Sequence, residues 1–169
     1  MQLVRYSTLT ALLLCAAIAG FFYAYSVSVM WGLNDANPQS AIAAMQGINR
    51  VVRNIAFAPA FFGTPIALAF AAWAFWREGL GRAALLFLIA AAIYVLGAVL
   101  PTLAISVPMN NLLAEAGTPA SDAAARLIWD EYSHRWLIWN TIRMLASFLS
   151  LALGLFALLA DGLTLGKSR

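Results

Sequence analysis

The segment WDEYSHRWLIWNTIR (residues 129–143) runs from a charged stretch directly into an apolar one and carries an arginine into it. At about 100° per residue, an α-helix places its aromatic and polar side chains on one face, whereas Asp130, Glu131 and His134 point elsewhere. Small residues continue this face further along the chain. The members of the face are Trp129, Tyr132, Trp136, Trp139, Asn140, Arg143, Ser147, Ser150 and Gly154. The segment therefore predicts a helix with one face that is aromatic, then polar, then small.

The rest of the chain is also strongly apolar. Of its 169 residues, 63% are hydrophobic and only 10% are charged, which lies outside the usual range of soluble domains. Four apolar stretches reach the length of about 20 residues that a helix needs to cross a bilayer. They cover about residues 9–33, 55–76, 83–107 and 137–160. The sequence predicts an all-α integral membrane protein, with residues 1–169 forming a single four-helix bundle domain.

Two of these helices are expected to extend beyond the membrane. Asn37 can cap a helix that begins at Pro38, and the moderately polar residues 39–54 lead into the second span. We expect them to continue the second helix without a break. A cap at Ser121 or Asp122 likewise begins an extension of the fourth helix.

The first and third spans also carry distinctive side chains. In the first, spacings of three and four predict a shared face that points into the bundle and makes Met30 a candidate ligand contact. This face consists of Gly20, Tyr23, Ser26, Met30 and Asn34. In the third, Pro108 is expected to disturb the helix near the membrane surface, which places Asn110 just beyond the span.

The charge distribution bears on partners and topology. The net charge of +3 comes from basic residues at the ends of spans, without the basic stripe that indicates nucleic-acid binding. With four spans, both termini share a side. That side holds Arg5, Arg77, Arg82, Lys167 and Arg169, and the other holds Arg50, Arg53, Arg126 and Arg135. The positive-inside rule favours cytoplasmic termini, in a bacterial inner membrane.

Polar side chains from several helices converge near the outer side of this bundle. They are Asn49, Arg53, Asn110, Asn140 and Arg143. An arginine within a membrane span is rare, usually faces the bundle interior or a wet cavity, and marks a functional site. No Asp or Glu lies in the predicted spans, so the partner of Arg143 is an amide oxygen, a backbone carbonyl, water or a bound anion. A structural role, with Arg143 reaching the headgroups and asparagines joining helices, stays open.

The tryptophans on the same side divide into two groups. Trp31 and Trp129 fit the aromatic belt found at membrane surfaces. Trp136 and Trp139 share the face of Arg143, and we expect them to form the wall of a pocket for a planar aromatic ligand.

Metal chemistry has little support. The chain has one histidine and one cysteine, and it lacks a zinc motif, a nucleotide-binding loop and a nucleophile elbow. We therefore expect no metal or organic cofactor. A soft copper site remains an alternative, because its candidate ligands share the outer side. These are Met30, Met45, Met109 and His134.

Four motifs stand out at these positions. They are Gly20-Phe21-Phe22 with Ser26 and Val29-Met30-x-Gly32-Leu33, Met45-Gln46-x-Ile48-Asn49, Val107-Pro108-Met109-Asn110-Asn111-x-Leu113, and Trp129-x-x-Tyr132-x-x-x-Trp136-x-x-Trp139-Asn140-x-x-Arg143. Together they resemble the anthrone oxygenase-like membrane family over nearly the whole chain. Trp31 departs from the pattern, since the family often has proline there. The resemblance implies a four-span monooxygenase that oxidises anthrones, or related phenols and hydroquinones, with molecular oxygen and without a metal or flavin.

The resemblance also implies roles for the site residues. An anthrone loses a proton to give an aromatic enolate, which reacts with oxygen directly. Substrate contacts would come from Trp136, Trp139, Met30 and Arg53. The enolate oxygen would be stabilised by Arg143, Asn140, Asn49 and Asn110, and the proton relayed by Tyr132 or His134.

The residues leave open whether the pocket catalyses a reaction. A protein that only binds or transports a quinone, a lipid or a small phenol would use the same pocket. The small-residue faces would also suit a protein that assembles with another membrane protein or forms a homo-oligomer. The partners expected in each case are membrane lipid and a hydrophobic aromatic molecule.

Overall fold

The computed structural model describes residues 1–160, and four helices in this part are long and apolar enough to cross a membrane. They run Gln2–Asp35, Phe57–Arg77, Gly81–Glu115 and Asp122–Leu159. No strand occurs among the described residues. These helices confirm the predicted all-α membrane bundle. Residues 161–169 of the predicted domain lie outside the described part.

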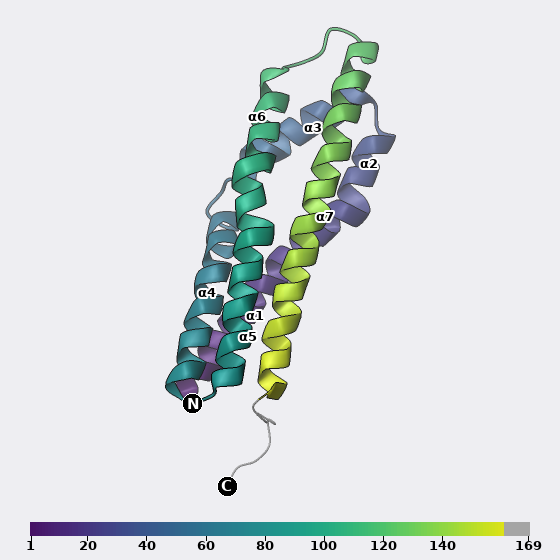
Figure 1. The fold of residues 1–169 in the computed structure, drawn as a ribbon. Helices are drawn as coiled ribbons and strands as arrows, with labels where there is room; N and C mark the ends of the chain where they lie inside the picture. The colour runs from purple at the N-terminus through teal and green to yellow at the C-terminus, as the bar shows by residue number, and fades with distance from the viewer. Residues whose placement is uncertain (161–169) are drawn as a thin grey trace.

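Several of the long helices are composite. In chain order the elements are α1 (Gln2–Ala24), η1 (Tyr25–Val29), α2 (Met30–Asp35), α3 (Pro38–Val51), α4 (Phe57–Arg77), α5 (Gly81–Tyr94), η2 (Val95–Val99), η3 (Thr102–Ser106), α6 (Val107–Glu115) and α7 (Asp122–Ala160). The η elements are π-helical turns, in which an N–H bonds to the carbonyl five residues back instead of four. We call the end of the bundle that carries α2, α3 and α6 the outer end; α1 begins and α7 ends at the opposite, inner end (Figure 1).

The stretch before the second span is a separate helix. α3 ends at Val51 and α4 begins at Phe57, so the expected unbroken extension of the second helix is wrong. Asn54 is the cause, because its Oδ1 accepts the backbone N–H groups of Ala56 and Phe57, both at 2.9 Å, and so begins a new helix. α3 instead packs against α6 and α7 at the outer end (Figure 1). The predicted cap at Asn37 is confirmed.

The third long helix also extends past its predicted span. It continues through α6 to Glu115, beyond the end predicted at Val107. Pro108 does not interrupt it, because this residue lies in the first turn of α6 directly after η3, where a missing N–H is tolerated. Asn110 therefore lies on a helix.

The predicted face and extension of the fourth helix are confirmed. α7 runs for 39 residues from Asp122, and the hydroxyl of Ser121 accepts the N–H of Ala124 at its start. Most of the predicted face is buried, while His134 is exposed and Trp139 is half-buried. The buried members are Trp129, Tyr132, Trp136, Asn140, Arg143, Ser147, Ser150 and Gly154.

The predicted face of the first span is wrong in part. Ser26 and Met30 are buried, whereas Gly20 is exposed and the Tyr23 side chain is 50% exposed. Two successive spacings of three turn an α-helix by about 120°, so Gly20 and Tyr23 drift away from the buried line. That line runs through Phe22, Ser26 and Met30 at spacings of four, which the wider turn of η1 keeps on one face.

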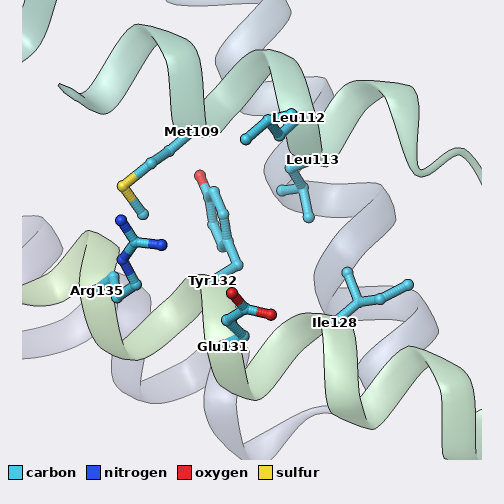
Figure 2. A pocket seen from close by; sticks show the side chains of 7 residues that line it. All are labelled: Met109, Leu112, Leu113, Ile128, Glu131, Tyr132 and Arg135. Carbon is cyan, nitrogen blue, oxygen red and sulfur yellow. The ribbon is translucent and has the colours of Figure 1, made fainter. Parts of the chain in front are cut away.

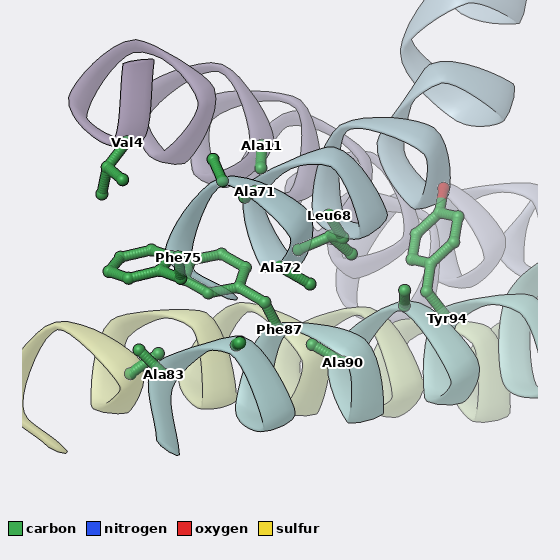
Figure 3. Close-up of a cluster of buried hydrophobic side chains, with 14 of the residues drawn as sticks. Val4, Ala11, Leu68, Ala71, Ala72, Phe75, Ala83, Phe87, Ala90 and Tyr94 are labelled. Atoms are coloured by element: carbon green, nitrogen blue, oxygen red, sulfur yellow. The ribbon is translucent and has the colours of Figure 1, made fainter. Parts of the chain in front are cut away.

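Alanines and a few large side chains fill the inner half of the bundle (Figure 3). Leu68, Phe75, Phe87 and Tyr94 are fully buried there, with small side chains between them that let membrane helices approach closely. The rings of Phe75 and Phe87 stack with their centroids 5.3 Å apart. The Tyr94 hydroxyl donates to the carbonyl of Phe61 at 3.1 Å. We call the buried cluster that these side chains form, with members from α1, α4, α5, η2 and α7, the inner core.

The third and fourth helices pack closely at Gly97. A Cβ placed on this residue would lie 2.4 Å from the Cβ of Ala146 on α7. Neither atom belongs to a flexible side chain, so any larger residue would force the two helices apart.

This contact predicts a position-specific loss of stability. Gly97→Ala is expected to lower the midpoint of thermal unfolding in detergent, by an overpacking cost of about 1–3 kcal/mol. Gly20→Ala is the matched control, because a Cβ there meets nothing within 4 Å. Equal midpoints for the two variants would contradict the close packing of η2 against α7.

Candidate functional site

A second buried cluster at the outer end consists of Met30, Ala41, Ile42, Met45, Met109, Leu113, Ala125, Trp129, Tyr132 and Trp136. A cavity of about 410 Å³ lies between the inner core and this second cluster. Its volume falls in the range of small-molecule sites, about 300–1,000 Å³. Aromatic lining comes from Phe21, Phe22, Tyr25, Phe57, Phe61, Phe62 and Trp136. Polar lining comes from Asn49, Arg53, Thr102, Ser106, Asn110 and Arg143. The apolar walls with a few polar groups are typical of a site for a small organic ligand.

Arg143 lines this cavity from α7 and is only 4% exposed. Its Nε donates to the carbonyl of Trp139 at 3.3 Å, and its Nη1 to Thr102 Oγ1 at 3.3 Å. Its Nη2 donates to Asn140 Oδ1 at 3.4 Å. All three acceptors are neutral, and the distances exceed the about 2.7–2.9 Å of a bond between ionised partners. The guanidinium has five N–H donors, so it keeps capacity for a ligand.

No carboxylate among the described residues forms an ion pair with Arg143. Aromatic rings supply part of the compensation, since its Cζ lies 4.8 Å from the ring centroid of Phe22 and 5.3 Å from that of Trp136. Such contacts contribute about 0.5–2 kcal/mol, whereas desolvating a charge costs several kcal/mol. An anionic group bound in the cavity would offset this cost.

Asn140 accepts a hydrogen bond from the Arg143 guanidinium and is itself held by the first helix. This side chain is fully buried, and its Nδ2 donates to the carbonyl of Phe22 and to Ser26 Oγ, both at 2.8 Å. Its Oδ1 is thereby turned toward Arg143. Asn140 does not line the cavity and acts on it through Arg143.

A second polar group joins three helices. The Tyr132 hydroxyl donates to Asn110 Oδ1 at 2.9 Å and accepts from Asn49 Nδ2 at 3.2 Å. Asn110 Oδ1 also accepts from Trp136 Nε1 at 3.2 Å. Asn49, Asn110 and Trp136 line the cavity. Tyr132 does not line it, and its hydroxyl holds the two asparagines.

Arg53 lies at the open edge of the cavity. It is exposed, and its Nη2 donates to Asn111 Oδ1 at 3.1 Å. Its charge is therefore solvated, unlike that of Arg143.

Comparison with known families connects this geometry to a protein class. Residues 52–153 match the family described as anthrone oxygenase. The chain belongs to the anthrone oxygenase family. No curated protein and no solved structure gives a significant match.

The part that matches the anthrone oxygenase family holds most of the polar site. It includes Arg53, Thr102, Ser106, Asn110, Tyr132, Trp136, Asn140 and Arg143. The remaining lining residues precede the matched segment: Phe21, Phe22, Tyr25, Ile48 and Asn49.

Two residues predicted to contact substrate lie away from the cavity. Trp139 is half-buried and packs against the second cluster, and Met30 is fully buried within that cluster. Trp136 and Arg143 are seven residues apart and align within about 20° on α7, whereas Trp139 and Asn140 fall on either side of that line.

The candidate copper ligands lie in two different surroundings. Met30, Met45 and Met109 are buried in the second cluster, and His134 is exposed. Within the described residues, no group of three His, Cys, Asp or Glu side chains is placed to hold a metal ion.

The two outermost tryptophans differ in exposure. Trp31 is exposed, as expected for an aromatic belt. Trp129 is buried in the second cluster, and its Nε1 donates to Asn34 Oδ1 at 2.9 Å. This bond joins α7 to α2, so Trp129 is a packing residue.

Sequence reasoning assigned no role to several residues that the structure brings to the site. Phe22 lies beneath the guanidinium of Arg143, Thr102 accepts from it, and Tyr25 contacts Trp136 with ring centroids 5.4 Å apart. A signal was present on the third helix, where Thr102, Ser106 and Asn110 follow at spacings of four.

A smaller cavity of about 200 Å³ lies on the other side of Tyr132, between α6 and α7 (Figure 2). Its polar lining comes from Glu131, Tyr132 and Arg135 on α7, and Met109 faces them from α6. Tyr132 thus lines the small cavity while its hydroxyl binds two residues of the large one.

Loss of this hydroxyl should be measurable. Tyr132→Phe leaves the amide of Asn49, a side chain only 8% exposed, without its acceptor. We expect stability to fall by about 1–3 kcal/mol, seen as a lower midpoint of thermal unfolding in detergent. Tyr23→Phe is the control, since this tyrosine is half exposed and its hydroxyl makes no hydrogen bond within residues 1–160. The same midpoint in both variants would argue against a structural role for the Tyr132 hydroxyl.

Proposed function

We propose that the protein is a membrane monooxygenase that oxidises a planar aromatic substrate, an anthrone or a related phenol or hydroquinone, with molecular oxygen. Membership of the anthrone oxygenase family supports the general kind of function. The aromatic lining of the cavity supports a flat substrate, because rings stack favourably on rings.

The observation that carries the proposal is the environment of Arg143. A buried guanidinium whose hydrogen-bond partners within residues 1–160 are all neutral faces an aromatic cavity. The reaction of an anthrone with oxygen passes through an aromatic enolate, so its rate rises when a fixed positive charge stabilises that anion.

The reaction balances without an added reductant. The CH₂ carbon opposite the ketone loses a proton, and the electron pair moves onto the ketone oxygen. Electron transfer to oxygen and recombination form a C–O bond, and protonation gives a hydroperoxide. Loss of the second C–H proton with cleavage of the O–O bond gives the second ketone. One oxygen atom enters the product and the other leaves as water. The substrate supplies the electrons, so the proposal needs no metal or flavin.

The proposal divides the polar residues by role. Arg143 contacts the enolate oxygen, and Asn140 positions Arg143. Tyr132 positions the amides of Asn49 and Asn110. His134 is exposed outside the site and has no part in the proposal. The released proton leaves to water at the edge beside Arg53.

We further propose that both termini are cytoplasmic and that the membrane is a bacterial inner membrane.

Phe62 and Leu103 line the cavity but are also 46% and 50% exposed on membrane-spanning helices. An apolar substrate would therefore enter from the lipid.

The test is oxygen uptake by purified protein in detergent. With anthrone as substrate, the wild-type protein should consume oxygen and form anthraquinone above the rate of spontaneous oxidation. Arg143→Met should lower kcat/KM by about 10²- to 10³-fold, as expected for loss of a group that stabilises a developing oxyanion. Arg126→Met is the control, because Arg126 is an exposed arginine on the same helix.

Two outcomes would count against the proposal. Equal turnover by folded Arg143→Met and wild type would remove Arg143 from the mechanism. Anthrone that binds and is recovered unchanged, without oxygen uptake, would favour a protein that binds or transports the ligand.

A further inference from the structure

Ser106 carries a buried hydroxyl that no other group in residues 1–160 satisfies. The side chain is 2% exposed and lines the large cavity, and its Oγ has no hydrogen-bond partner. Burying a hydroxyl without a hydrogen bond costs free energy, so a ligand that bonds to Ser106 would remove this cost.

Several other helical hydroxyls bond to the carbonyl four residues back. Four of them do so at 2.6–2.9 Å: Thr64, Thr102, Ser147 and Ser150. Ser106 is the last residue of η3, and the carbonyl of Thr102, four residues back, accepts the backbone N–H of Val107 instead. The π-helical turn therefore coincides with a hydroxyl that lacks the usual local bond.

Thr8 shows that a free hydroxyl does not by itself mark a site. Its Oγ1 is also buried without a partner among the described residues, but Thr8 lines neither cavity. The carbonyl of Val4, four residues back, accepts from Ser7 Oγ at 3.1 Å. Ser106 differs from Thr8 because it lies in a cavity with polar groups on both sides.

These polar groups form a line along the third helix. Thr102, Ser106 and Asn110 all line the cavity, and each spacing of four corresponds to about 6 Å along a helix. Thr102, at one end of the line, accepts a hydrogen bond from the Arg143 guanidinium.

Asn110 marks the other end of the line. Its Oδ1 accepts from the Tyr132 hydroxyl and from the indole N–H of Trp136, which can only donate. These bonds fix the amide orientation and leave its NH₂ group without a partner in the described part of the chain.

We propose that Ser106 and the Asn110 amide form a second ligand contact, which binds a neutral hydroxyl or carbonyl oxygen on the aromatic substrate. The identity of the ring system rests on the proposed function. A hydroxyl on the ligand can both donate to and accept from Ser106, and Asn110 donates. The ligand then spans the distance between the two contacts, with its anionic oxygen at Arg143 and its second oxygen at Ser106. The contact makes the protein prefer rings that carry a second polar group over bare rings.

Two unreactive probes test this preference. 9-Fluorenone, whose single carbonyl serves the Arg143 contact, and 2-(hydroxymethyl)-9-fluorenone differ by one neutral alcohol, and their binding in detergent is measured by quenching of tryptophan fluorescence. We expect wild type to bind the alcohol about tenfold more tightly, the effect of one buried hydrogen bond. Ser106→Ala should reduce this ratio to about twofold or less, whereas Thr8→Ala should retain it.

Thermal unfolding separates a binding role from a packing role. Ser106→Ala removes an unsatisfied hydroxyl, so its unfolding midpoint should equal or exceed that of wild type. Full retention of the preference by Ser106→Ala would overturn the proposal. So would equal weakening of both probes with a lower midpoint. Because neither probe is oxidised, a failure of oxygen uptake with anthrone would count against the proposed function alone.

Discussion

The unpaired charge of Arg143 is the constraint on which the outer half of this bundle depends. A guanidinium inside an apolar bundle needs many weak partners when no carboxylate is supplied, and here they come from three helices: an aromatic ring from the first, a hydroxyl from the third, and an amide and a carbonyl from the fourth. Asn140 in turn is held by the first helix. These hydrogen bonds and ring contacts thus also hold the helices around the cavity, where a bound anion would add an ionic partner.

The sequence predicted the features that depend on one helix at a time. The lengths of the apolar stretches gave four spans, and the 3.6-residue period gave the buried face of α7, including the separation of His134 from Arg143. The break between α3 and α4 was missed because hydropathy carries no information on helix caps. The Asn54 side chain accepts two backbone N–H groups, and a new helix begins there. The first-span face failed because a spacing of three or four alone does not reveal a drift in helical phase, nor a widened turn such as η1.

The sequence predicted which residues form the site better than it predicted which side chains face the cavity. An arginine and asparagines in apolar surroundings pointed to Asn49, Asn110, Asn140 and Arg143, and the structure brings them into two connected groups. Which of Trp136 and Trp139 lines the cavity depends on which helices flank α7, and a single helical period contains no such information. The role of Tyr132 was out of reach for the same reason, because its hydroxyl acts between residues on two other helices.

The π-helical turns have an evolutionary consequence. Each one holds a surplus residue relative to an α-helix, so deletion of a single residue within η3 would restore α-helical register without breaking the helix. Such a deletion would rotate α6 by about 100° relative to α5 and carry Asn110 away from Tyr132 and Trp136. Insertions and deletions in this turn are therefore a route by which related chains could exchange the polar end of the cavity in one step while the packing of the inner core stays as it is.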